Sequence, residues 1–115
     1  LSDRNLNRLA FRAVGGLART GANLSNGSGD FVIAFSTANL VADAPKDSVT
    51  QLTELPNERM SPLFQAAMES VEEAILNSLL KATTVQGNIG HIGRAISIEH
   101  LREVITKVQP ELIEK

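Results

Sequence analysis

At 115 residues the chain has room for a single domain, residues 1–115, with one hydrophobic core. Eleven basic residues against thirteen acidic ones give a net charge of −2, and the only aromatic residues are four Phe. The chain therefore lacks both the positive field and the stacking surface of a nucleic-acid-binding protein. The absence of Cys excludes disulfides, thiolate metal sites and a cysteine nucleophile.

Membrane and export signals are not visible in the sequence. The longest apolar run is about five residues, against the roughly 20 that a membrane-spanning helix needs. No signal-like apolar block opens the chain, so we expect a soluble protein, with the cytoplasm as the default compartment. The chain begins at Leu1, directly at a helix start, which suggests a fragment of a longer protein.

The first predicted element is an amphipathic helix from the capping residues Ser2 and Asp3 to about Thr20. Its apolar residues recur at three- and four-residue spacing: Leu6, Leu9, Ala10, Ala13 and Leu17. Gly15 and Gly16 would allow close packing against this helix. Three arginines spaced four apart on another face are typical of a solvated basic stripe: Arg4, Arg8 and Arg12.

A loop from Thr20 to Gly29 leads into the most apolar segment, which we predict to be a strand from Asp30 to about Ala38. Its alternate residues form two faces: Phe31, Ile33 and Phe35 on one, and Val32, Ala34 and Ser36 on the other. Both faces are apolar or small. We therefore expect a strand that is covered on both sides, within a sheet or between two layers.

A polar connection with three prolines follows, and residues 49–55 within it have the composition of an edge strand. Ser61 and Pro62 predict the start of a long helix that ends near Ala82. Its apolar stripe consists of Phe64, Ala67, Met68, Val71, Ile75, Leu79 and Ala82.

The last part of the chain predicts a turn, a short strand and a helix. Glycines at three-residue spacing indicate the turn: Gly87, Gly90 and Gly93. Residues 95–98 predict the strand, and a helix through Val104 and Val108 should end at Pro110. The fold class is α+β.

The sequence contains neither the motif spacing of a phosphate-binding loop nor that of a histidine metal site. None of the glycine-rich segments follows a strand, opens a helix and carries the lysine of a phosphate loop. His91 and His100 lack further ligands at metal spacing, and Glu103 beside His100 is typical of a surface pair. We expect neither a metal nor a cofactor.

The remaining candidate is the loop before the strand, with Ser28 and Asp30 and the flanking Asn26, Gly27 and Gly29. These residue types often make only a turn. Alternatively, the hydroxyl and the carboxylate either alternate across the strand start or converge in a turn, where they can polarise a second nucleophilic group. No Ser-His-Asp set is evident, so a hydrolytic base would not be histidine.

Five separated blocks carry a family resemblance: ARTG, NGSGD, AFSTAN, EEAILN and ATT. Together they resemble the C-terminal (β) portion of the self-processing L-aminopeptidase/D-esterase family, which includes the β-peptidyl aminopeptidases. The similarity covers nearly the whole chain. It implies half of a four-layer αββα sandwich, with long helices packed on a mainly antiparallel sheet.

The resemblance also implies a reaction. Members are inactive precursors that cut themselves once, and the new N-terminal serine becomes the nucleophile, with its own α-amine as general base. Ser28 and Asp30 match the hydroxyl and carboxylate of the family's S-G-[DE] segment: Ser28 would hydrogen-bond near the nucleophile, and Asp30 would hold an ammonium group. The implied partners are a short peptide, amide or ester substrate, the N-terminal (α) portion of the same precursor, and further copies in a homo-oligomer.

Two departures limit the resemblance. In the family the nucleophilic serine lies a strand's length upstream of the helix that begins here at Ser2. We therefore expect the chain alone to be inactive, with a sheet edge exposed where the first strand is missing. Where the family has a charged pair between two glycines, this chain has His91-Ile92. A non-catalytic assembly or ligand-binding module of the same fold stays as the alternative function.

Overall fold

The computed structural model describes residues 1–39, 49 and 51–109. Its regular elements are α1 (Asp3–Arg19), η1 (Asn57–Arg59), α2 (Met60–Leu80), β1 (Val85–Gln86), η2 (Asn88–Gly90), β2 (Ile92–Gly93) and α3 (Ile98–Val108). They fall into two compact units, Leu1–Glu73 and Ala74–Lys115, which are described separately; α2 runs through the boundary. The described part is α+β, with three helices and one small antiparallel sheet.

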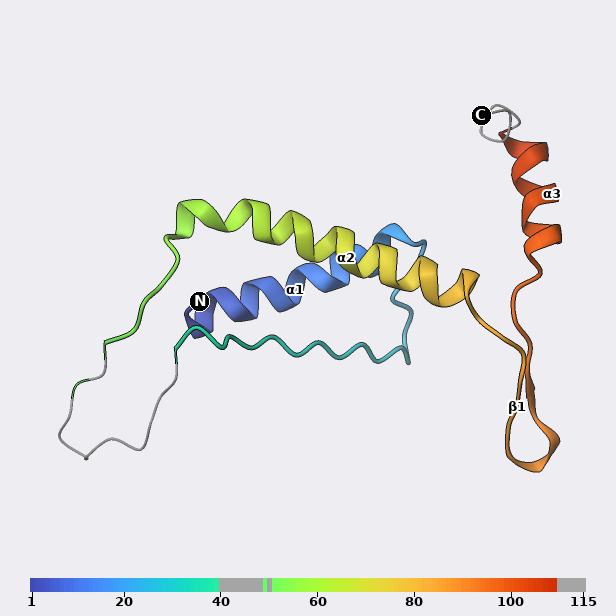
Figure 1. Ribbon diagram of the computed structural model, residues 1–115, viewed down its shortest axis with the longest axis horizontal. Coiled ribbons are helices and arrows are strands. Elements are labelled where there is room, and N and C mark those ends of the chain that lie inside the picture. Colours follow the sequence, from blue (N-terminus) through green and yellow to red (C-terminus); the bar gives the residue numbers. More distant parts are fainter. Residues whose placement is uncertain (40–48, 50, 110–115) are drawn as a thin grey trace. The chain divides into compact units, whose positions relative to one another are not determined.

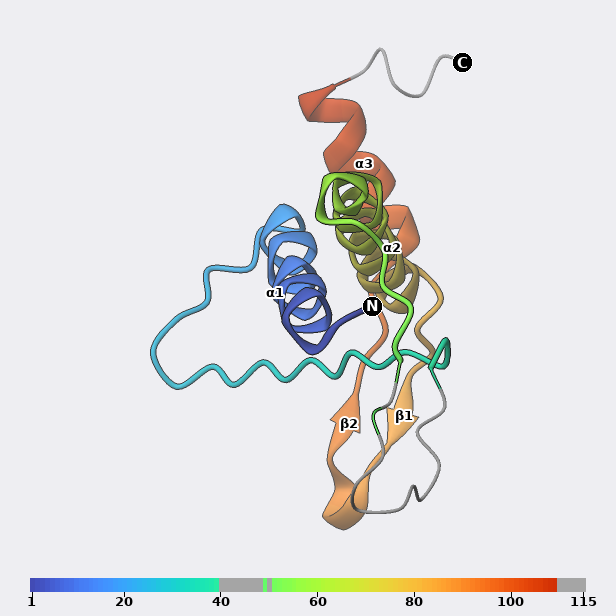
Figure 2. The same ribbon diagram turned by 90° about the vertical axis from the view of Figure 1, so that its left-hand side faces the viewer.

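In the first unit α1 and α2 lie side by side and run in the same direction (Figures 1 and 2). Glycine makes this close approach possible. A Cβ atom on Gly16 would lie 2.5 Å from the Met68 carbonyl oxygen and 2.8 Å from Val71 Cβ. On Gly15 it would meet only the flexible end of Met68, at 3.1 Å from Sδ. The predicted role of this glycine pair in close packing is therefore confirmed, most strictly at Gly16.

The best-buried apolar side chains of the described residues lie at the start of α2, where Met60 is 1% exposed and Phe64 8%. Arg8 and Arg12 of α1 cover Phe64, with guanidinium carbons 4.9 and 4.4 Å from the ring centroid. Arg8 also donates hydrogen bonds to Oδ1 of the buried Asn5, at 3.0 Å, and to Oδ1 of Asn57. The expected solvated stripe is thus corrected at Arg8 and Arg12, because their charge is delocalised enough to stack on an aromatic face.

Both long helices appear where the apolar periodicity predicted them. Helix α1 matches the prediction, although Ser2 makes no side-chain capping bond. Helix α2 begins at Met60 rather than after Ser61, because the turn of η1 leads directly into it. It ends at Leu80, within the usual uncertainty of a helix end near the predicted Ala82.

The segment from Asp30 to Ala38 passes beneath both helices of the first unit in an extended course (Figure 2). Within the described residues no strand pairs with it. Phe31, Ile33 and Phe35 are 95%, 87% and 79% exposed, whereas Ala34 and Ser36 are half-buried. The predicted strand covered on both faces is therefore wrong for the part of the chain that the structure describes, because there only the helix side has a neighbour.

The connection before α2 is irregular where it is described. Val49 and residues 51–55 are not in a strand, so the predicted edge strand is absent there; residue 50 lies outside the described residues. The side chain of Asn39 instead makes two bonds to Thr53. Its Nδ2 donates to the Thr53 carbonyl at 3.0 Å, and its Oδ1 accepts from the Thr53 N–H at 3.1 Å.

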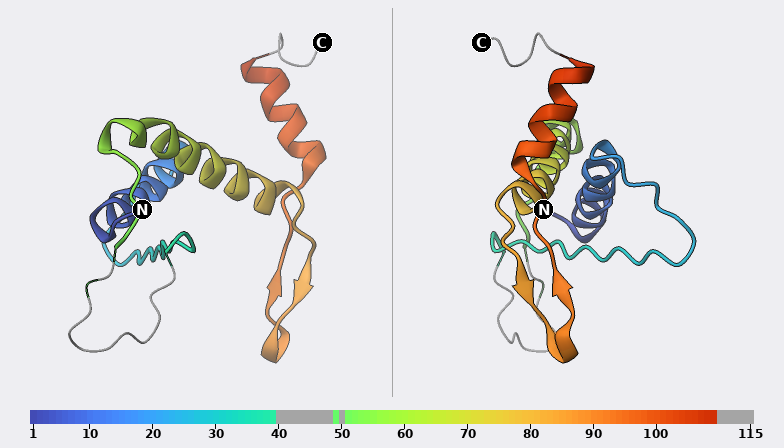
Figure 3. Two further views of the ribbon diagram at one scale, coloured as in Figure 1. Left: turned by 60° about the vertical axis from the view of Figure 1, so that its left-hand side comes forward. Right: turned by 90° about the vertical axis from the view of Figure 1, so that its right-hand side faces the viewer.

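In the second unit β1 and β2 form an antiparallel hairpin followed by α3 (Figure 3). The glycine-rich turn is thus the tip of a hairpin, and the second strand lies at Ile92–Gly93 rather than at residues 95–98. Ser97 instead caps α3, because its Oγ accepts the N–H of His100 at 3.1 Å. The helix ends at Val108, and the predicted stop at Pro110 lies outside the described residues.

Of the helices in the described part of the chain, none combines the length and hydrophobicity that crossing a lipid bilayer would require.

Candidate active-site loop

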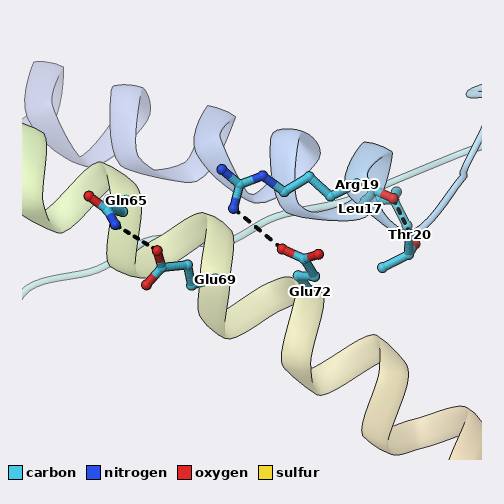
Figure 4. A network of polar contacts seen from close by, with 6 residues as sticks. All are labelled: Leu17, Arg19, Thr20, Gln65, Glu69 and Glu72. Carbon is cyan, nitrogen blue, oxygen red and sulfur yellow. Dashed lines mark hydrogen bonds and ion pairs between the residues drawn. The ribbon is translucent and has the colours of Figure 1, made fainter. Parts of the chain in front are cut away.

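The candidate loop leaves α1 through a glycine cap. Thr20 Oγ1 donates to the Leu17 carbonyl at 2.7 Å (Figure 4). The Gly21 N–H donates to the Ala18 carbonyl at 3.1 Å. Gly21 has φ +88°, the left-handed conformation that a residue with a side chain rarely adopts. The loop therefore starts from a fixed point.

A tight turn follows at residues 25–28, where the Ser28 N–H donates to the Ser25 carbonyl at 2.9 Å. Gly27 has φ +91° as the third residue of this turn, which is the position where a type II turn needs a positive φ. Gly27 therefore has a structural role that explains its presence, and Asn26 precedes it in the same turn. Gly29 has no such role, because a Cβ atom there would meet the Phe31 ring only at an ordinary 3.6 Å.

The turn brings the two candidate side chains together. Ser28 Oγ donates to Asp30 Oδ2 at 3.4 Å, and both residues are exposed. Of the two arrangements that the sequence leaves open, the structure has the convergent one. The contact is long for a hydroxyl–carboxylate hydrogen bond, so both groups retain capacity for a further partner.

Asp30 makes this loop a site that can accept hydrogen bonds from a positively charged group. A carboxylate accepts up to about four hydrogen bonds, and Asp30 uses one within the described residues. Such a group holds an ammonium or a protonated amine, and the adjacent hydroxyl can donate or accept next to it. It is not a complete hydrolytic centre, because neither residue is paired with a base.

One loop residue was not found from the sequence. Leu24 has φ +46°, a conformation that costs about 1 kcal/mol or more for a residue with a branched side chain. Next to it, Asn23 Nδ2 donates to Ser25 Oγ at 3.4 Å. Nothing in the residue types signals a left-handed leucine, so only coordinates could reveal it.

The two histidines lie apart from this loop in sequence. His100 Nδ1 is 3.5 Å from Glu103 Oε2 on the exposed side of α3, as expected for a surface pair. His91 lies after η2 at the hairpin tip. Across residues 1–39, 49 and 51–109, no three His, Asp or Glu side chains gather as a metal site would require.

Comparison with known proteins gives the chain a family. The sequence profile of Peptidase family S58 matches residues 1–93. Two curated relatives are both named β-peptidyl aminopeptidase BapA. The one from Sphingosinicella microcystinivorans is 39% identical over 102 residues, which are 89% of this chain and 26% of the relative. The one from Sphingosinicella xenopeptidilytica is 32% identical over 88 residues, which are 76% of this chain and 22% of the relative.

A solved structure is also similar to this chain. The PH0078 protein from Pyrococcus horikoshii OT3 superposes with a TM-score of 0.82 at 47% identity, over 95% of this chain and 31% of that one. The chain thus spans about a quarter of the length of the curated relatives that it matches. Since the family profile covers most of its residues, the chain belongs to Peptidase family S58.

Proposed function

We propose that this chain is part of an aminopeptidase that cuts itself once and then uses the new N-terminal serine as nucleophile. The observation that carries the proposal is the convergence of Ser28 and Asp30 in a rigid turn at the start of an extended segment. The family membership and the two relatives named β-peptidyl aminopeptidase support the same activity. The substrates would be short peptides, amides or esters with a free N-terminus.

In this mechanism Ser28 and Asp30 position the reacting groups, and the nucleophile and its base belong to the terminal serine. The α-amine of the terminal serine takes the proton from its hydroxyl as the oxygen attacks the scissile carbonyl, and it then passes the proton to the leaving group. Asp30 would hold the ammonium of the enzyme or of the substrate, because a carboxylate with free acceptor sites is the natural partner for that group. Ser28 would donate a hydrogen bond close to the nucleophile. This arrangement needs no histidine.

The nucleophile would come from the N-terminal portion of the same precursor. The bare face of the segment at Phe31, Ile33 and Phe35 supports this partner, because water contact with three large side chains is costly at about 25 cal/mol per Å². A second sheet packed there would complete a four-layer αββα sandwich, of which this chain would supply the helix pair and the strand beneath it.

The test is Asp30→Asn in the complete gene product, assayed with aminoacyl p-nitroanilides. We expect kcat/KM to fall at least about 100-fold, since the amide keeps the shape of the side chain but loses the charge that holds an ammonium. The melting temperature should barely change, because Asp30 is exposed. Asp3→Asn, the same change on the exposed start of α1, is the matched control and should keep full activity.

Two outcomes would refute the proposal. If Asp30→Asn lowers the melting temperature by several degrees, the carboxylate is a turn residue. If the wild-type protein neither cuts itself nor hydrolyses any of these substrates, the non-catalytic assembly or ligand-binding module is the better description.

A further inference from the structure

Leu24 is a strained residue of the candidate loop that the proposed function does not use. Its φ of +46° is left-handed, a conformation that residues other than glycine, asparagine and aspartate rarely adopt. The side chain is 46% exposed, so packing against the described residues leaves nearly half of it uncovered. Burial therefore explains neither the strain nor the choice of leucine at this position.

The loop holds Leu24 in place from both sides. Upstream, the N–H of Gly21 bonds back to the end of α1. Downstream, the Ser28 N–H donates to the Ser25 carbonyl at 2.9 Å and closes the turn. Asn23 Nδ2 also donates to Ser25 Oγ at 3.4 Å, so a side-chain bond spans Leu24 itself. Backbone strain persists only where the surroundings impose it, and such positions concentrate at active sites and in ligand-binding loops.

Leu24 lies within reach of a substrate whose ammonium group is held by Asp30. The Cα atoms of Ser25 and Ser28 are less than about 7 Å apart, because a hydrogen-bonded turn joins these residues. Leu24 is one residue further along, which adds at most about 3.8 Å between Cα atoms. In an α-amino acid the side chain and the ammonium are bonded to the same carbon. An ammonium at Asp30 therefore brings the side chain of the substrate's first residue to the end of the loop where Leu24 lies.

We propose that Leu24 contacts the side chain of the substrate's N-terminal residue and selects for apolar side chains there. This inference rests on the proposed function, because it takes the substrate's ammonium to lie at Asp30. Ser28 and Asp30 fix the polar end of the substrate, and the adjacent leucine discriminates between side chains. Such a combination of a few polar groups with apolar contacts is usual in small-molecule sites. The strained backbone is what it costs to hold a leucine, rather than a glycine, at this point of the loop.

The experiment compares kcat/KM of the complete gene product for leucine p-nitroanilide and glycine p-nitroanilide. The two substrates have the same ammonium group and the same scissile bond, so the ratio of their kcat/KM values isolates the recognition of the side chain. We expect the wild type to favour the leucine substrate. Leu24→Asn introduces a polar side chain of similar size that tolerates the left-handed conformation. It should lower the ratio at least about tenfold, while kcat/KM for the glycine substrate stays within about threefold of the wild type.

A second variant, Leu24→Gly, separates the side-chain contact from the backbone conformation. Glycine adopts a positive φ without strain, so the loop should keep its course and the melting temperature should change by no more than about 3 °C. The ratio should nevertheless fall as in Leu24→Asn, because the apolar side chain is gone. Leu80→Asn is the matched control. Leu80 is 47% exposed at the end of α2, and its replacement should leave the ratio unchanged.

The inference is overturned if the wild type does not favour the leucine substrate, or if both Leu24 variants keep the wild-type ratio. It is also overturned if they lower kcat/KM equally for both substrates, because Leu24 would then only shape the loop, or if Leu80→Asn lowers the ratio as strongly. In each of these cases the wild type is still active, so the proposed function stands. A wild type that hydrolyses no aminoacyl p-nitroanilide would refute the proposed function, and this inference with it.

Discussion

The contact between α1 and α2 and the extended segment at residues 30–38 are both apolar, but the described residues cover both sides only of the first. At the helix contact, glycine brings two backbones together and Phe64 is buried under two arginines. Along the segment, the side chains of Phe31, Ile33 and Phe35 are largely exposed in the described part of the chain. The described residues therefore cover the helix contact on both sides, whereas they cover the segment only on its helix side.

The largest effect should come from the helix contact. Phe64→Ala removes the ring that Arg8 and Arg12 cover, and we expect a loss of about 3–5 kcal/mol in the free energy of unfolding. Phe64→Leu keeps most of the volume and should cost less than about 1.5 kcal/mol. Urea unfolding measures both. Equal losses would show that stacking, rather than volume, matters at this site.

The segment should respond according to its surroundings. Phe35→Ser should change the unfolding free energy of this chain alone by no more than about 0.5 kcal/mol, because the side chain is exposed. In the complete gene product the same change should cost about 2–4 kcal/mol, since a second layer would bury Phe35 there. Thermal melts of both forms give the difference. A small effect in the complete protein would mean that nothing covers this face.

Adding a methyl group at Gly15 or at Gly16 should have different effects, because the first would meet a flexible side chain and the second would meet backbone. Gly16→Ala should cost about 1–3 kcal/mol, because its Cβ would press on backbone and Val71, although alanine favours the helix by about 1 kcal/mol. Gly15→Ala meets only the flexible end of Met68 and should be neutral or slightly stabilising. Chemical denaturation of the two variants side by side is the measurement. A Gly15→Ala variant as unstable as Gly16→Ala would contradict this description of the contact.

The smallest effect should come from the ion pair at the far end of the same contact. Arg19 Nη1 lies 3.3 Å from Glu72 Oε2, but the side chains are 43% and 34% exposed, so water and salt screen the attraction. We expect Arg19→Ala to lower the free energy of unfolding by no more than about 0.5 kcal/mol. The loss should be smaller in about 0.5 M salt, where the Debye length is only roughly 4 Å. Denaturation at two salt concentrations tests this. A loss above about 1 kcal/mol would show that the pair is better shielded than its exposure indicates.

The parts that were predictable from the sequence are those that depend on near neighbours in the chain. Apolar spacing located α1 and α2, and the glycine pair predicted their close approach. The two apolar faces of the segment were also visible, but not that Phe31 and Phe35 would be exposed in the described part of the chain, because exposure depends on contacts between distant residues. The two-residue strands of the hairpin were missed, since elements this short have no periodicity to detect.

The candidate site was predictable only as a choice between two arrangements. Ser28 and Asp30 are two residues apart, so an extended strand would place them one after the other on the same face, whereas a turn brings their side chains into contact. The positive φ of Gly27 decides for the turn, and a glycine in a sequence permits that conformation without requiring it. The stacking of Arg8 on Phe64 was likewise out of reach, because residues 56 apart in the chain meet only in the folded structure.

The side chain of Asn39 makes with Thr53 the same two bonds that one residue makes with the residue opposite it in an antiparallel ladder. An amide on a side chain thus ties two points of the backbone together without any regular pairing of the residues on either side. Lengthening the connection between these two points should cost little, since closure entropy grows only by about 0.6 kcal/mol for each doubling of length. A longer connection between residues 39 and 53 is therefore compatible with the same helices and the same loop, provided that Asn39 holds its two ends.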